Sequence, residues 1–248
     1  MRPINACLIR ALLPLLLLSG CAIRPRFKQI GVTTAGEALR ELVNRSESVD
    51  QFSANANCSI RGAFGQFQFR SKLKYSAADG WFVKMTGPLG INLAIIESEE
   101  DEFHINIPHN GSEITIDANE PVEIPGIELT FPSLTFLTRL LLPVVWIDDP
   151  SAWEIVADKQ ENSHMVYLVK KADNSLDSLV LSLDFSPLRL HSEEFWRGGD
   201  LVIGRDFKYR SARDNIPRAI EIHAADATLK MVFDSMRLET VTPHKPAV

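Results

Sequence analysis

Cys21 is the residue whose surroundings specify a covalent modification. It ends the run Leu18-Ser19-Gly20-Cys21, which closes a short apolar segment preceded by Arg2 and Arg10. A basic start, a short apolar run and small residues at a processing point are typical of a secretory signal, and the run is far shorter than the roughly twenty residues that span a bilayer. The four residues match the lipobox of bacterial lipoproteins. We therefore expect residues 1–20 to be removed and Cys21 to be diacylated on its sulfur.

The alternative is an ordinary signal peptide with a chance cysteine, but that would more naturally show an Ala-x-Ala cleavage pattern, which the sequence lacks. Two or three acyl chains, at about 0.8 kcal/mol per buried methylene, anchor a protein almost permanently. Ala22 follows the cysteine, where an aspartate would hold an enterobacterial lipoprotein at the inner membrane. The expected location is the cell envelope, on the periplasmic face of the outer membrane, with residues 21–33 as a lipidated tether.

The net charge argues against a nucleic-acid partner, and the cysteine count argues against an internal disulfide. The formal net charge of −6 becomes −8 once the two signal arginines are removed, and phosphate binding needs clustered basic residues, so no nucleic-acid partner is expected. Cys58 is the thiol left besides Cys7 and Cys21, which leaves no internal disulfide. It lies on the apolar phase of an expected strand, where a small buried hydrophobe is the favoured interpretation.

The remaining candidate chemistry is sparse. The histidines have no metal-site spacing, and no nucleophile elbow, Walker loop or dinucleotide glycine pattern occurs. The acidic run at residues 97–102 is typical of a solvated turn. We expect no catalytic residues, no metal, no cofactor and no enzymatic activity, with a lipid hydrolase as the least favoured function class.

The elements that must position any site are mostly strands. Thr34 and Glu37 form a capping-box pattern that predicts an amphipathic helix of about three turns. Alternation of apolar and polar residues then predicts six strands between residues 52 and 118, and seven more between 153 and 238. The pattern breaks at residues 119–150, where Ser133–Leu142 reads as one nearly all-apolar, buried helix. These patterns predict a mainly β domain at residues 34–240, a single strongly curved antiparallel sheet with two or more helices on its concave side, and a tail at 241–248.

This order of elements resembles the LolA/LolB superfamily of lipoprotein carriers, and its LolB-like branch in particular. The most specific residues are Gly87-Pro88-Leu89-Gly90 between two strands, similar to the Pro-Leu-Gly hairpin of that branch, and the segments 216–222 and 228–233, which look like its last hairpin. The chain is longer than typical members, with extra material around 186–215. The resemblance implies an open half-barrel lidded by helices, with an apolar cavity for acyl chains and a protruding leucine that helps insert lipoproteins into the membrane.

The resemblance assigns residues to both sites. The membrane-insertion loop would be Pro88, Leu89 and Gly90; the alternative for Leu89 is a side chain folded back onto the sheet. The acyl-chain cavity would be lined by apolar residues of three predicted elements: Phe67, Phe69, Leu73, Trp81, Val83, Met85, Phe136, Leu137, Leu140 and Leu141. The alternative is that these side chains merely pack against one another.

The expected function is therefore a lipid-anchored, monomeric acceptor that receives lipoprotein cargo from a periplasmic carrier. A structural or assembly lipoprotein that binds a protein partner through the same fold is the alternative.

Overall fold

A computed structural model describes residues 31–63, 65–123, 130–131, 133–145, 153–161, 164–171, 177–211, 214–224 and 227–241. The signal peptide, Cys21, most of the tether and most of the tail lie outside these residues, so the expectations for them stay predictions. Neither helix in the described part has the length and apolar composition that crossing a bilayer requires.

The helix α2 (Ala35–Glu47) begins where the capping pattern predicts. The backbone N–H of Glu37 donates to Oγ1 of Thr34 at 3.2 Å, and the Glu37 carboxylate accepts from the backbone N–H of Thr34 at 3.3 Å. These bonds satisfy two amides that a helix start leaves unpaired. The apolar face of α2, with Leu39 and Val43, is buried. The predicted amphipathic helix is confirmed.

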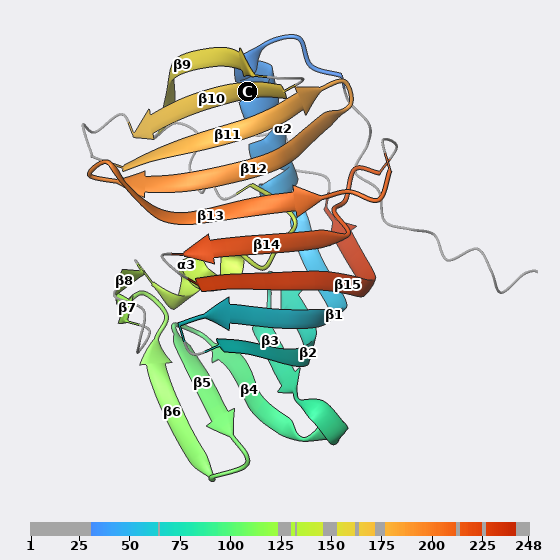
Figure 1. Cartoon of the computed structure of the whole chain (residues 1–248), viewed down its shortest axis with the longest axis vertical. Coiled ribbons are helices and arrows are strands. Elements are labelled where there is room, and N and C mark those ends of the chain that lie inside the picture. Colours follow the sequence, from blue (N-terminus) through green and yellow to red (C-terminus); the bar gives the residue numbers. More distant parts are fainter. Residues whose placement is uncertain are drawn as a thin grey trace, which may run out of the picture.

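Thirteen strands form one antiparallel sheet in the order β6-β5-β4-β3-β2-β1-β15-β14-β13-β12-β11-β10-β9. The first half consists of β1 (Val49–Gly62), β2 (Gly65–Ser76), β3 (Gly80–Thr86), β4 (Asn92–Glu99), β5 (Glu102–Ile107) and β6 (Ser112–Asp117). The second half consists of β9 (Trp153–Glu161), β10 (His164–Lys171), β11 (Asp177–Phe185), β12 (Leu188–Arg197), β13 (Asp200–Lys208), β14 (Ala219–Ala224) and β15 (Ala227–Thr240). The two halves meet where β1 pairs with β15 (Figure 1).

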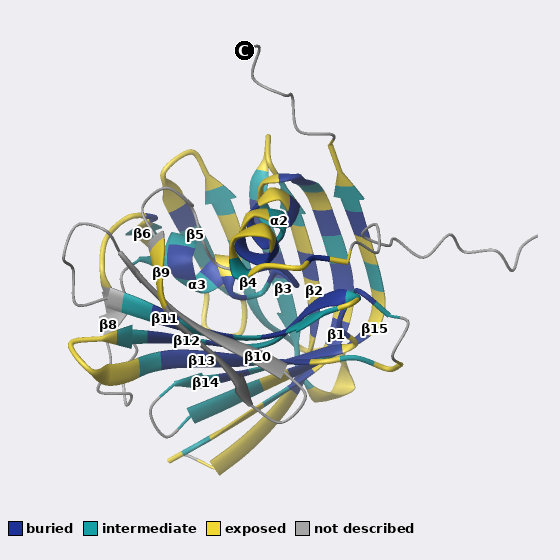
Figure 2. Cartoon of the chain, turned by 90° about the horizontal axis from the view of Figure 1, so that it is seen from above, coloured by how far each residue is buried: buried dark blue, intermediate teal, exposed yellow. Residues whose placement is uncertain are grey.

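The sheet is strongly curved and does not close, since β6 and β9 remain its edges. Seen from above, both helices lie on its concave side, between the two arms (Figure 2). Alternate side chains of β1 point inward: Phe52, Ala54, Ala56 and Cys58 are buried, and the residues between them are more exposed. The predicted open half-barrel with helices on its concave side is confirmed.

The insertion between the halves differs from its prediction. The helix α3 (Leu134–Arg139) is shorter than the expected Ser133–Leu142, and its C-cap is Leu140. Leu141 and Leu142 bond three residues back, to the carbonyl oxygens of Thr138 and Arg139, and Pro143 has no N–H with which to continue the helix. Two short strands, β7 (Val122–Glu123) and β8 (Thr130–Phe131), also pair in a segment where no β structure was expected.

Candidate functional site

A cavity of about 630 Å³ lies between the inner face of the sheet and α3. Its walls come from β1 to β4, from β13 to β15 and from α3 with the residues that follow it. The lining is almost wholly apolar, with Ser71 and Thr138 among the few polar side chains. Ligand pockets of this kind measure about 300–1,000 Å³ and are mostly apolar. The cavity could hold a flexible apolar chain.

Eight of the ten residues predicted for the acyl-chain cavity line it: Phe67, Phe69, Leu73, Val83, Met85, Leu137, Leu140 and Leu141. On α3, Leu134 and Leu137 share the cavity-facing side because residues three apart lie on one helix face. Phe67 is 47% exposed and stacks on Phe69, with ring centroids 6.0 Å apart. A stacked aromatic pair, with Phe67 exposed and Phe69 buried, therefore forms part of the wall.

Trp81 and Phe136 do not line this cavity. Trp81 is buried in an aromatic cluster with Tyr75 and Phe52, at centroid distances of 5.1 and 6.5 Å. Phe136 is two positions from Leu134, which turns it away from the cavity and onto Phe195 of β12 at 5.7 Å. For these two residues, packing is the observed role.

The prediction missed the part of the wall contributed by the last strands. Ile203, Ile222, Leu229 and Met231 line the cavity opposite β2 and β3, and Cys58 and Ile60 join them from β1. Each lies on the inward phase of its strand, so the alternation was visible in the sequence. The pairing of β1 with β15, which sets Cys58 directly opposite Met231, was not visible in the sequence.

Arg205 fixes the chain that follows α3. Its Nη1 donates to the carbonyl oxygens of Leu140 and Leu142, both at 2.9 Å, and its Nη2 donates to that of Val144 at 2.7 Å. Its Nε donates to the Glu193 carboxylate at 2.8 Å, and the pair is fully buried. Burial lowers the pKa of Arg205, and the charge of Glu193 opposes that shift. One side chain thus joins the far end of the α3 segment to β12 and β13.

Cys58 places a free thiol in the cavity wall. Burial raises the pKa of this thiol to about 12. Since the thiolate is the reactive form, Cys58 is inert at neutral pH. Its role in the wall is that of a small hydrophobe, as expected.

The predicted insertion loop forms the short 3₁₀ turn η1 (Pro88–Gly90) between β3 and β4. Leu89 is 99% exposed and has φ +61°, in the left-handed region that favours glycine. Ile91 beside it is 56% exposed. The side chain therefore projects from the sheet, and the alternative of a folded-back leucine is wrong.

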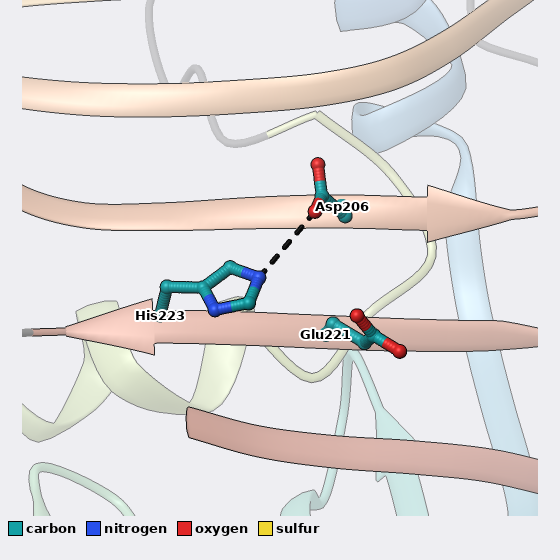
Figure 3. A group of neighbouring side chains, drawn as sticks. All are labelled: Asp206, Glu221 and His223. Atoms are coloured by element: carbon teal, nitrogen blue, oxygen red, sulfur yellow. Dashed lines mark ion pairs between the residues drawn. The ribbon is translucent and has the colours of Figure 1, made fainter. Parts of the chain in front are cut away.

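A polar cluster lies on the outer face of the sheet: Asp206 on β13, with Glu221 and His223 on β14 (Figure 3). Nε2 of His223 is 3.4 Å from Oδ2 of Asp206, and the potential ligand atoms lie within 4.8 Å of one another. Sequence spacing could not reveal the cluster, because its members come from two strands.

Both carboxylates of the cluster form ion pairs with lysines. Lys230 bonds to Glu221, and Nζ of Lys208 is 3.7 Å from Asp206. The hydrogen bond from Lys230 is the main cause of a lowered pKa for Glu221. We assign the cluster to ion pairing across β13, β14 and β15.

A histidine–carboxylate pair, the usual start of acid–base chemistry, occurs away from the cavity. His191 of β12 and Asp184 of β11 are 2.8 Å apart, and neither lines the cavity. Within the described residues, the cavity wall contains no histidine or carboxylate. The wall suits binding better than hydrolysis.

Comparison with known proteins gives likeness of structure but none of sequence. No family model and no curated protein matches the chain. A domain from Vibrio parahaemolyticus, named for outer-membrane lipoprotein sorting, aligns with TM-score 0.56 and 14% identity over 84% of this chain and 94% of that one. A LolA superfamily protein from Nitrosomonas europaea aligns with TM-score 0.52 and 13% identity over 85% and 96%.

A DUF1329 family protein from Desulfovibrio piger aligns with TM-score 0.55 and 13% identity over 83% of this chain and 94% of that one. At these identities the likeness concerns the fold alone. The chain has the LolA-like half-barrel fold over most of its length, as the resemblance in sequence pattern implied.

Proposed function

We propose that this protein is a lipid-anchored lipoprotein of the cell envelope that holds acyl chains in its half-barrel and receives or inserts lipoproteins at the outer membrane. The observation that carries the proposal is the cavity between the sheet and α3. Among the described residues its wall has no acidic or basic side chain, so an acyl chain could enter without stripping water from a charged group. The likeness to a domain named for lipoprotein sorting supports the same function.

The other parts of the proposal concern how the protein is anchored, how it delivers cargo and where the cargo comes from. Cys21 would hold the protein at the membrane through its own acyl chains. Leu89 would be the apolar tip that contacts the bilayer when cargo is delivered. The cargo would come from a periplasmic carrier, and no catalytic step or cofactor is involved.

The test uses residues 22–248, produced without lipid, and a triacylated lipoprotein loaded on a purified periplasmic carrier. We expect the lipoprotein to move to the wild-type protein. Leu137→Glu places a carboxylate in the cavity, where it would have to shed its water or stay protonated, so acyl binding should fall about tenfold or more. Arg139→Glu is the matched control because Arg139 lies two residues along α3, exposed and outside the cavity wall.

Equal loss in the two variants would show a general effect on α3 and not on the cavity. If the wild-type protein takes up neither lipoprotein nor lipopeptide nor fatty acid, the proposal fails. The fold would then be that of a structural or assembly lipoprotein that binds a protein partner.

A further inference from the structure

Among the residues that the structure describes, four basic side chains on the outer face of β2 and β3 have no acidic partner. We call them the cationic stripe: Arg70, Lys72, Lys74 and Lys84. Arg70, Lys72 and Lys74 alternate along β2, so they share a face, and Lys84 of β3 lies directly opposite Lys72. None of the four has an ion pair in the described part of the chain.

Such an arrangement costs stability, because like charges directly opposite each other on adjacent strands repel. Elsewhere on the outer face, two basic residues of β15 have acidic partners. Lys230 pairs with Glu221, and Nη2 of Arg237 is 2.6 Å from Oε1 of Glu239. In the stripe, cations without an ion pair among the described residues lie side by side on adjacent strands, which indicates that their counter-charge comes from another molecule.

The stripe adjoins the exposed apolar turn. A groove of about 650 Å³ on the outer face runs between η1 and the strands β2, β1 and β15. Arg70 and Lys230 line it on one side, and Pro88 and Leu89 on the other. An apolar tip with cations beside it matches the layered boundary of a bilayer, where acyl chains lie beneath anionic headgroups.

We propose that the cationic stripe and Leu89 together dock the outer face of β2 and β3 on an anionic lipid surface. The stripe would lie over the headgroup phosphates while Leu89 enters the apolar layer. The cavity lies on the opposite, inner face of the same strands, so docking leaves the α3 side uncovered. The proposal does not depend on what the cavity binds. An acidic protein is the competing partner, and it offers no apolar layer to a single protruding leucine.

The test measures how fast each lysine of the full chain is acetylated when the protein is reconstituted in vesicles. One set of vesicles is phosphatidylcholine alone, and in the other a third of the lipid is phosphatidylglycerol. We expect Lys72 and Lys84 to react about fivefold or more slowly on the anionic vesicles, because headgroup contact excludes the reagent. Lys208, on β13 and outside the stripe, should react equally on both. In about 1 M salt, where the Debye length is ~3 Å, the protection should disappear.

The variant Lys72→Glu/Lys84→Glu should lose the protection of Lys74, whereas Lys208→Glu should keep it. Equal acetylation of the stripe on both kinds of vesicle would overturn the proposal. So would protection that appears only when polyglutamate is added, which would assign the stripe to an acidic protein. The readout uses no cargo, so its failure leaves the acyl-binding proposal untouched, and the reverse also holds.

Discussion

Leu89 has a backbone conformation that its side chain does not favour. Its φ of +61° places it in the left-handed region, which costs an ordinary L-residue about 1–2 kcal/mol. The side chain is 99% exposed, so no burial offsets that cost. Strain of this kind persists mainly where it serves a function. We therefore place the functional demand on the side chain of Leu89 itself.

Replacing Leu89 by glycine separates function from stability. Leu89→Gly removes both the strain and the apolar tip, so the free energy of unfolding should stay equal or rise by up to about 1 kcal/mol, while delivery of cargo to vesicles falls. Leu89→Glu should show the same loss of delivery, and both variants should still bind cargo. Leu89→Met, which keeps an apolar tip, is the control. Delivery by Leu89→Gly at the wild-type rate would show that the tip is dispensable.

At the scale of elements, the wall around α3 depends on a contact from a distant strand. Arg205 of β13 accounts for three carbonyl groups in the residues that follow α3, and these are groups that a longer helix would have paired internally. The buried guanidinium and the early end of the helix are therefore two aspects of one arrangement. It holds Leu140 and Leu141 in the cavity wall.

Arg205→Met should be strongly destabilising, because it removes the cation that pairs with the buried Glu193 carboxylate and the donor to three carbonyl oxygens. Removing one member of a buried ion pair typically costs about 3–5 kcal/mol, measurable by urea unfolding. Adding Glu193→Leu should restore only the part of that loss that comes from the buried carboxylate, because the three carbonyl oxygens still lack the guanidinium donor. Arg218→Met is the control: Arg218 is exposed, and surface changes are usually within about 0.5 kcal/mol. If Arg205→Met unfolds at the same urea concentration as this control, Arg205 does not hold the α3 segment.

The elements also show how far the sequence predicts this fold. A period of two reveals a strand and which of its side chains face inward, so the strands and eight of the predicted cavity residues emerged from pattern and resemblance. A period does not identify the neighbouring strand. The pairing of Cys58 with Met231, and hence the wall from β13 to β15, therefore required the structure.

The errors around α3 have the same origin. Its apolar run indicated burial but not which side chain faces which neighbour, so Phe136 was assigned to the cavity although it packs on Phe195. Likewise, the carbonyl groups that follow the helix bond to Arg205, more than sixty residues away in sequence. Local pattern contains no information about such a contact.

At the scale of the whole molecule, the two proposed membrane contacts lie far apart. The chain enters the fold where the backbone N–H of Val32 donates to the carbonyl oxygen of Phe185 at 3.2 Å, beside β11. This end of the long axis is opposite the turn between β3 and β4 that contains Leu89 (Figure 1). The ten residues from 22 to 31 span at most about 36 Å when extended. With a tether of this length, Cys21 and Leu89 can contact one membrane when the long axis lies along its surface, which is the orientation that docking through the cationic stripe requires.

Replacing Cys21 by alanine should remove the acyl anchor and leave the cationic stripe in place. The wild-type protein should incorporate labelled palmitate and stay with the membrane in high salt, because its acyl chains bury many methylenes at about 0.8 kcal/mol each. Cys21→Ala should incorporate none. Any membrane binding that it keeps would be electrostatic, through the stripe, and should be released by salt, since screening weakens exposed charges. Fractionation in low and high salt separates acyl anchoring from electrostatic binding. Adding Lys72→Glu/Lys84→Glu to Cys21→Ala should remove the electrostatic binding. A Cys21→Ala protein that stays bound in high salt would refute the anchor, because neither the stripe nor a single exposed leucine could hold it there.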